Sequence, residues 1–101
     1  MNCYITHSVY FRLKHRAGSI KEKEFIESCQ RILSPIPGVE AFRVLRQTSA
    51  KNNFDFGLTM DFGSQSAYDA YNNHPDHVEF VRGIWIPNVE DFMEIDYTEN
   101  Y

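Results

Sequence analysis

Residues 54–62, FDFGLTMDF, alternate between two kinds of side chain. Every second position is apolar: Phe54, Phe56, Leu58, Met60 and Phe62. The positions between them are polar or small: Asp55, Gly57, Thr59 and Asp61. Because successive side chains of a β-strand point to opposite faces of the sheet, this pattern predicts a strand that presents one apolar face to a core.

The remaining elements follow from similar patterns. Alternating side chains predict strands over residues 4–13, 39–47 and 89–97. Apolar residues at helical spacing predict an amphipathic helix over residues 20–33, with Ser19 and Glu22 forming a capping box at its start. A second helix is expected from about residue 65, with Ser64 or Ser66 as its N-cap, and a short helix or turn follows Pro75.

The order of elements is β-α-β-β-α-β, which is typical of an α+β, ferredoxin-like domain with two helices on one face of an antiparallel sheet. We expect one such domain over residues 1–101. In the last strand Phe92 points to one face while Met93, Ile95 and Tyr97 point to the other. Since helices cover only one face, the second apolar face predicts a homodimer whose two sheets pack face to face.

Composition narrows the classes of partner. The chain of 101 residues has a formal charge of −4 and no cluster of Lys or Arg, which argues against nucleic-acid binding. Its apolar runs are too short to span a membrane, and the first residues resemble no signal peptide. We therefore expect a cytoplasmic protein with Cys3 and Cys29 as reduced thiols, and without a glycine-rich phosphate loop we expect no cofactor.

The segment YNNHPDHVEF, residues 71–80, carries the most chemistry. His77 can exchange protons near neutral pH, and the Tyr71 hydroxyl can donate a hydrogen bond to a developing oxyanion. The alternative is that both side chains only fix a helix end. His74 is assigned a structural role beside Pro75, and no metal is predicted, because His74 and His77 lack the i, i+4 spacing of zinc-binding helices.

Four segments together resemble the stress-responsive dimeric α/β-barrel (Dabb) family: THSVYFRLK, IPGVEAFRVLRQ, AYNNHPDHVEF and DFMEIDY. The resemblance covers nearly the whole chain, in the family's order. It implies a dimer whose two sheets close into a barrel. The family contains stress-induced proteins and plant polyketide cyclases of the olivetolic acid cyclase type.

The resemblance also implies roles for individual residues. In those cyclases a tyrosine and the second histidine of a His-Pro-x-His segment carry the chemistry, and a histidine of the first strand lies nearby. These match Tyr71, His77 and His7. The chain departs from the cyclases at two pocket positions, where Phe56 replaces a histidine and Cys29 replaces a tyrosine.

The resulting hypothesis is a pocket between sheet and helices that binds a small, largely apolar carbonyl compound. His77 would be the acid/base, Tyr71 the oxygen stabiliser and His7 a second polar contact. The expected wall is Phe56, Leu58 and Met60 from the third strand with Phe25 and Cys29 from the first helix, although core packing is the favoured role of Cys29. Glu94 is expected either at the rim or near the cavity.

Two other functions fit the same sequence. In one, the protein is a non-catalytic stress or structural protein, and the same residues hold the fold together. In the other, it is an enzyme resembling cofactor-free monooxygenases, whose substrate would itself activate oxygen. An open cavity that reaches His77 distinguishes the enzyme hypotheses from the structural one.

Overall fold

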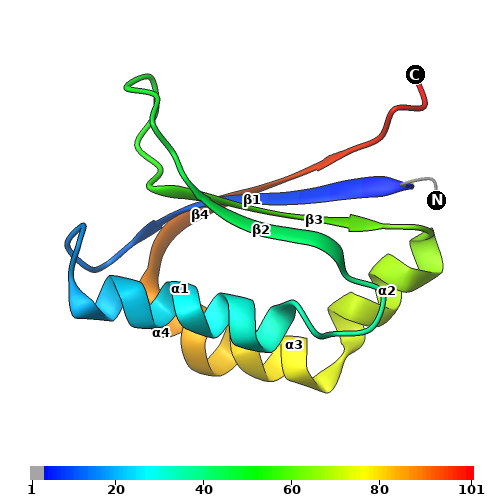
Figure 1. Ribbon diagram of the computed structural model, residues 1–101, viewed down its shortest axis with the longest axis horizontal. Coiled ribbons are helices and arrows are strands. Elements are labelled where there is room, and N and C mark those ends of the chain that lie inside the picture. The colour runs from blue at the N-terminus through cyan, green and yellow to red at the C-terminus, as the bar shows by residue number, and fades with distance from the viewer. Residues whose placement is uncertain (1–3) are drawn as a thin grey trace.

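The structure, a computed structural model, describes residues 4–101, so Cys3 lies outside the described residues. Four strands form one antiparallel sheet in the order β2-β3-β1-β4, and the helices cover one of its faces (Figure 1). The strands are β1 (Ile5–Leu13), β2 (Glu40–Arg46), β3 (Phe56–Phe62) and β4 (Val89–Tyr97). The ferredoxin-like fold predicted from the sequence is therefore confirmed.

The helical layer has more parts than the sequence indicated. It consists of α1 (Ile20–Leu33), α2 (Gln65–Asn73), α3 (Pro75–Phe80), the π-helix η1 (Val81–Trp85) and α4 (Ile86–Asn88). The bounds of α1 agree with the prediction, and Ser64 rather than Ser66 is the N-cap of α2, accepting a hydrogen bond from the Ala67 N–H. None of the helices formed by residues 4–101 is long and apolar enough to cross a membrane.

The start of α1 differs in detail from the predicted capping box. The Ser19 hydroxyl accepts a hydrogen bond from the Glu22 N–H at 3.2 Å, as expected. The Glu22 carboxylate, however, accepts from the Gly18 N–H at 3.0 Å, because the Ser19 N–H already donates to the Arg16 carbonyl. Glu22 also accepts from Arg46 of β2 at 2.8 Å, so this buried carboxylate ties the helix to the sheet.

β3 begins two residues later than predicted. Asp55 still joins its neighbours through backbone hydrogen bonds with Phe11 and Gln47. Its carboxylate, however, accepts from the Leu13 N–H at 3.1 Å, a donor that a regular strand would pair with a backbone carbonyl. This side-chain bond replaces the sheet ladder at the end of β3.

His74 has the predicted structural role. It ends α2 and begins α3, where its Nδ1 accepts a hydrogen bond from the Asp76 N–H at 3.1 Å. Pro75 occupies the first turn of α3, where its missing N–H costs nothing. The chain therefore turns sharply between the two helices, and this turn places Tyr71 and His77 next to each other.

The core lies between the sheet and the helices and is rich in aromatic rings. Phe11 of β1 packs against Phe25, Phe56 and Trp85, with ring centroids 5.7, 5.5 and 5.0 Å away. The opposite face of the sheet has no helix on it (Figure 1). Met93 and Tyr97 are 45% and 48% exposed there, beside Tyr10, so the predicted second apolar face is present.

Candidate functional site

A cavity of about 510 Å³ lies between the helix-covered face of the sheet and the helices α2 to α4. It is lined by His7, Val9, Leu33, Leu58, Tyr71, Asn72, His77, Phe80, Val81, Trp85, Ile86, Phe92 and Glu94. Its wall is mostly apolar with a few polar groups that converge on it, which is the usual character of a small-molecule site. The cavity reaches the surface beside β4, where Phe92 and Glu94 are exposed.

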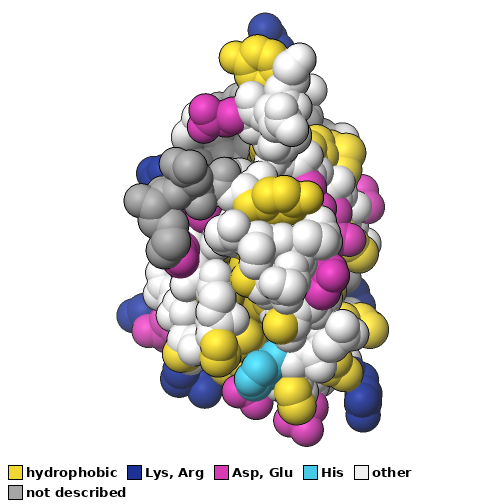
Figure 2. Space-filling view, turned by 90° about the vertical axis from the view of Figure 1, so that its right-hand side faces the viewer, with side chains coloured by type: hydrophobic (Ala, Val, Ile, Leu, Met, Phe, Trp, Pro, Cys, Tyr) yellow, Lys and Arg dark blue, Asp and Glu magenta, His cyan; other side chains and the backbone are white. Residues whose placement is uncertain are grey.

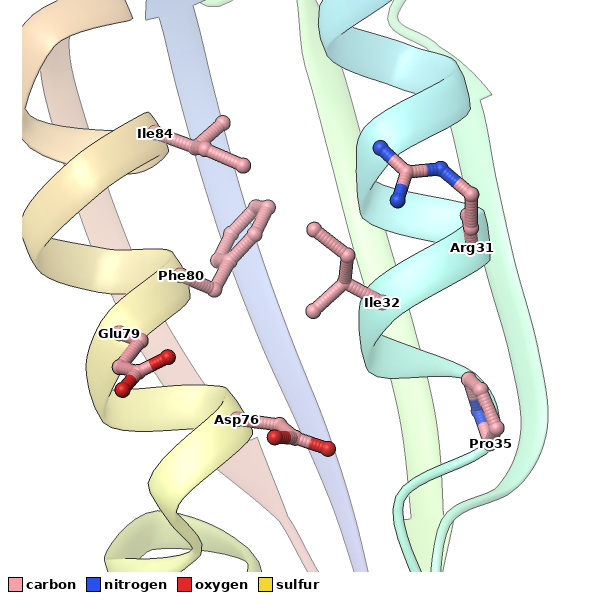
Figure 3. A pocket seen from close by; sticks show the side chains of 7 residues that line it. All are labelled: Arg31, Ile32, Pro35, Asp76, Glu79, Phe80 and Ile84. Atoms are coloured by element: carbon pink, nitrogen blue, oxygen red, sulfur yellow. The ribbon is translucent and has the colours of Figure 1, made fainter.

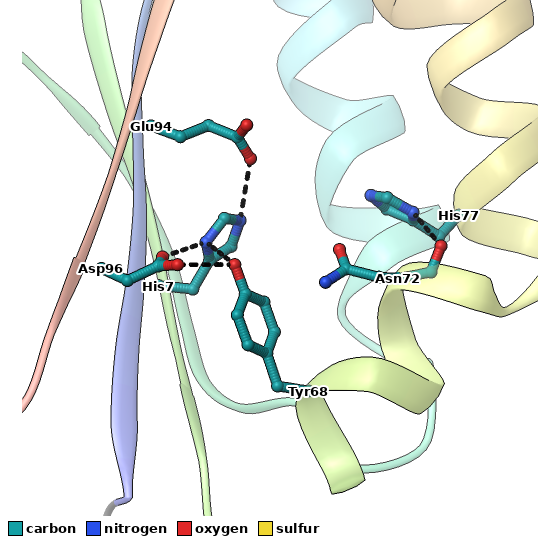
Figure 4. A network of polar contacts seen from close by, with 6 residues as sticks. All are labelled: His7, Tyr68, Asn72, His77, Glu94 and Asp96. Atoms are coloured by element: carbon teal, nitrogen blue, oxygen red, sulfur yellow. Dashed lines mark hydrogen bonds and ion pairs between the residues drawn. The ribbon is translucent and has the colours of Figure 1, made fainter. Parts of the chain in front are cut away.

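His77 presents one ring nitrogen to the cavity. Its Nδ1 lies 3.1 Å from the Asn72 backbone carbonyl, and because a carbonyl only accepts, Nδ1 donates this bond. The other ring nitrogen, Nε2, faces the side on which His7 and Glu94 lie (Figure 4). Burial lowers the pKa of His77 below its ordinary value of 6.5, so the neutral imidazole, with a lone pair on Nε2, is favoured.

Tyr71 lies directly beside His77 and is only 2% exposed. The centroids of the two rings are 4.4 Å apart. The Tyr71 hydroxyl has no hydrogen-bond partner among residues 4–101. In that part of the chain every fully buried side-chain oxygen or nitrogen has a partner, so the hydroxyl oxygen is not fully buried and must reach the open space of the cavity. Burial raises the pKa of Tyr71, and nearby Cys29 and Tyr68 add to the effect, so the hydroxyl stays protonated and can donate.

His7 is held in place by a polar network on the sheet side of the cavity (Figure 4). Its Nδ1 lies 2.6 Å from Asp96 Oδ1 and 2.9 Å from the Tyr68 hydroxyl, which itself donates to Asp96 Oδ2 at 2.8 Å. Since a carboxylate accepts, His7 Nδ1 donates to Asp96. Burial and the hydrogen bond to Asp96 raise the pKa of Tyr68, which keeps this donor protonated.

Tyr68 and Asp96 also belong to the site, although the sequence patterns did not predict them. Asp96 lies opposite His7 in the register between β1 and β4, so the two side chains share one face of the sheet. Tyr68 reaches them from α2, one turn of helix before Tyr71. The i, i+3 spacing of the two tyrosines was a signal that could have identified Tyr68.

Trp85 and Phe92 form an aromatic part of the cavity wall that was also missed. Their rings meet edge to face with centroids 5.7 Å apart. Trp85 ends the π-helix, whose wider turn is marked by the Ile86 N–H donating to the Val81 carbonyl five residues earlier. π-Helical turns occur frequently at functional sites.

The structure separates the residues that the sequence predicted for this site. His7, Leu58, Tyr71 and His77 line the cavity together, and so does Glu94, at its exposed rim. Four other predicted residues are not among the lining residues and lie buried in the core: Phe25, Cys29, Phe56 and Met60. Packing with Phe11 holds Phe25 and Phe56 away from the open space, and burial raises the pKa of the Cys29 thiol to about 12.

A second hollow of about 450 Å³ lies on the outside of the helical layer, between α1 and the α3–η1 segment (Figure 3). Ile32 and Phe80 face each other across it, while Arg31, Asp76 and Glu79 stand around them. It contains no histidine or tyrosine. The cavity at His77 is therefore the better candidate for chemistry.

The end of the molecule where the chain termini lie shows small, separate hydrophobic groups among acidic side chains (Figure 2). A histidine reaches the surface in its lower, helical half (Figure 2).

Among residues 4–101 no group of three or more His, Cys, Asp or Glu side chains is arranged to hold a metal ion. The polar groups of the site are suited to hydrogen bonding and proton transfer instead.

Comparison with protein families identifies the domain. The profile of the stress responsive A/B barrel domain, Dabb, matches residues 5–99. No protein of curated function matches the chain.

Solved structures agree with this match. A Dabb family protein with a ferredoxin-like fold from Mesorhizobium loti is 49% identical, with a TM-score of 0.95 over 99% of this chain and 100% of that one. A dimeric ferredoxin-like protein of unknown function from Thermobifida fusca is 22% identical, with a TM-score of 0.77 over 93% and 89%. A hydroxynitrile lyase from Passiflora edulis is 16% identical, with a TM-score of 0.81 over 95% and 93%.

Proposed function

Because the chain belongs to the stress responsive A/B barrel domain family, we propose that it binds a small, largely apolar carbonyl compound in the cavity at His77 and acts on it by acid–base chemistry. The observation that supports this most is the pairing of Tyr71 and His77, ring to ring at 4.4 Å, in the wall of an open apolar cavity. The specific likeness to polyketide cyclases stays a prediction.

Each residue of the pair has a distinct chemical task. The Tyr71 hydroxyl, protonated and without a partner within residues 4–101, donates a hydrogen bond to the carbonyl oxygen of the ligand. Neutral His77 then takes a proton from the carbon next to that carbonyl through Nε2, and the C–H electron pair moves toward the oxygen. His77 returns the proton when the enolate collapses, so the cycle needs no oxidant or reductant.

The apolar wall selects the body of the ligand. Trp85, Phe92 and Leu58 offer flat or branched apolar surfaces in the wall of the same cavity. Burying such a body gains roughly 25 cal/mol for each Å² of apolar surface removed from water. We expect a ring or short chain of carbon atoms joined to the carbonyl group.

The protein is also proposed to act as a homodimer. Met93, Tyr97 and Tyr10 lie on the uncovered face of the sheet. Solved structures of the same fold from Thermobifida fusca and Bacteroides fragilis are described as dimeric, at 22% and 18% identity. Two such faces packed together would leave both cavities, which lie on the helix side, accessible.

Trp85 offers a direct test of binding, because it is the only tryptophan of the chain and lines the cavity. Acetophenone, an apolar ring with one carbonyl group, should change the fluorescence of Trp85 in a saturable manner. Free N-acetyltryptophanamide serves as the control and should show only quenching that rises linearly with acetophenone concentration. A linear, unsaturable response of the protein would contradict the proposed function and favour a purely structural role for these residues.

A further inference from the structure

His7 carries a polar atom that the proposed chemistry does not use. The residue is only 3% exposed, and its Nδ1 is committed to Asp96 and Tyr68. Its Nε2 has no hydrogen-bond partner among residues 4–101. Every fully buried side-chain nitrogen of that range has a partner, so Nε2 is not fully buried and is open to the cavity. A buried imidazole is thus held rigidly with one nitrogen facing the ligand space.

Glu94 stands across from this nitrogen. Its Oε1 lies 3.9 Å from His7 Nε2, which is too far for a direct hydrogen bond. Both side chains line the cavity, and Glu94 comes from β4, two residues before Asp96 on the same face of the strand. The two atoms therefore leave a gap that one polar atom of a ligand can bridge.

A hydroxyl group can bridge this gap when the His7 imidazole carries a proton on Nε2 as well as on Nδ1. When the imidazole is charged, Nε2 donates to the hydroxyl oxygen and the hydroxyl donates to Glu94. When the imidazole is neutral, with its proton on Nδ1, Nε2 and the Glu94 carboxylate both accept, so the single hydroxyl proton can be donated to only one of them. A carbonyl oxygen, which only accepts, is held in the charged state alone.

We propose that His7 and Glu94 form a hydroxyl-binding subsite at the mouth of the cavity, and that Asp96 and Tyr68 are positioning residues that fix the orientation of His7. The subsite rests on the proposed function, since it assumes that the ligand carbonyl lies at Tyr71 and His77. It narrows the ligand class to apolar compounds that carry both a carbonyl and a separate hydroxyl group.

Two probes that differ by one hydroxyl test the subsite. The dissociation constants of acetophenone and 4-hydroxyacetophenone are measured from the NMR shift of the Trp85 indole N–H. One well-placed, charge-assisted hydrogen bond should make the hydroxylated probe bind about tenfold more tightly to the wild type. Glu94→Ala should abolish this preference, whereas Glu90→Ala, which removes an exposed carboxylate elsewhere on β4, should preserve it.

The outcomes separate the subsite from the proposed function. Equal affinity for both probes in the wild type, or a preference that survives Glu94→Ala, would overturn the subsite and leave the proposed function intact. If neither probe shifts the Trp85 signal, the proposed function fails as well. His7 is not substituted in this test, because its burial makes loss of folding a competing explanation.

Tyr68→Phe tests the positioning role separately. Because Asp96 remains as the acceptor, the ¹⁵N signals of His7 should show the proton on Nδ1 in both proteins, whereas loss of the Tyr68 hydroxyl should change the Nδ1 chemical shift and weaken the preference for the hydroxylated probe. Tyr10→Phe is the matched control, because it removes a tyrosine hydroxyl of β1 that bonds Tyr97 on the opposite face. A wild-type His7 with its proton on Nε2 would contradict the role of Asp96, and a chemical shift and probe preference unchanged by Tyr68→Phe would contradict the role of Tyr68.

Discussion

At the scale of single residues, His77 combines two properties that acid–base chemistry needs. It is fixed by one hydrogen bond to the Asn72 carbonyl, and its free nitrogen faces the cavity. We predict that His77→Ala lowers the rate of deuterium exchange at the methyl group of acetophenone by roughly 10² to 10⁴. The free energy of unfolding should change little, and His15→Ala, which removes a histidine bonded to Asn88 outside the cavity, should leave the exchange rate intact.

The same residue predicts a dependence on pH. Burial places the pKa of His77 in the folded protein below its ordinary value of 6.5. The neutral base is therefore retained at pH 6.5 and is lost only as the pH falls further. The pH profile of the exchange rate should have its acid midpoint below 6.5, and a midpoint above that value would contradict the assignment of His77 as the base.

The free energy of unfolding should also decrease as the pH falls below 6.5. As the pH falls from 6.5 toward the lower pKa of folded His77, the unfolded chain takes up the proton first, so the free energy of unfolding decreases. His77→Ala should remove this contribution and flatten the stability profile in that window.

At the scale of elements, Glu22 joins the start of α1 to β2. Burial alone would raise its pKa, but hydrogen bonds from the Gly18 N–H and from Arg46 outweigh this and lower the pKa below 4.5. We predict that Glu22→Ala reduces the free energy of unfolding at pH 7 by about 1 to 2 kcal/mol, the size of a lost helix cap. Urea denaturation measures this, and Glu24→Ala, an exposed position of α1, serves as the control.

The pH dependence of this difference has a defined sign. Because the pKa of Glu22 is lowered on folding, its stabilising contribution is present above pH 4.5 and is lost as the pH falls through the pKa of the folded state. The difference in the free energy of unfolding between wild type and Glu22→Ala should therefore become smaller as the pH falls below 4.5. A gap that widens in acid would contradict the role given to Glu22.

The elements were largely predictable from sequence, and the network around His7 was not. Local patterns in the sequence predicted α1 and β4 at their observed bounds, and in α1 the pattern matches burial, since Phe25, Cys29 and Leu33 recur at helical spacing on its buried face. The contact between His7 and Asp96 spans 89 residues and depends on the pairing register of β1 with β4, which no local pattern encodes. The π-helix that places Trp85 in the wall likewise has no periodic signature.

The predicted cavity wall was only partly correct, for a different reason. The alternation in β3 correctly placed Phe56, Leu58 and Met60 on the helix-covered face. Only Leu58 reaches the cavity, since the ring of Phe56 stacks on Phe11 and Met60 is fully buried in the core. The sequence could show which face a side chain occupies, but it could not show where along that face the core stays open.

At the scale of the whole molecule, the uncovered sheet face governs assembly. A stable interface buries roughly 1,600 Å² in total, and this face offers exposed apolar side chains for it. We predict a dimer by sedimentation velocity at micromolar concentration, and at least a 10²-fold weaker dimer for Met93→Lys, because a charge would be buried without a partner. Ile20→Lys, on the exposed side of α1, should leave the dimer intact, and a monomeric wild type would contradict the proposed assembly.

The four histidines of the chain serve as internal probes of ligand binding in the cavity. His7 and His77 line the cavity, whereas His15 and His74 are not among its lining residues. During titration with acetophenone, the imidazole NMR signals of His77 should shift most and those of His7 should follow, both saturating at one concentration, while His15 stays unchanged. If His77 does not shift, or if His15 shifts as much as His77, the cavity is not the binding site and the proposed function is contradicted.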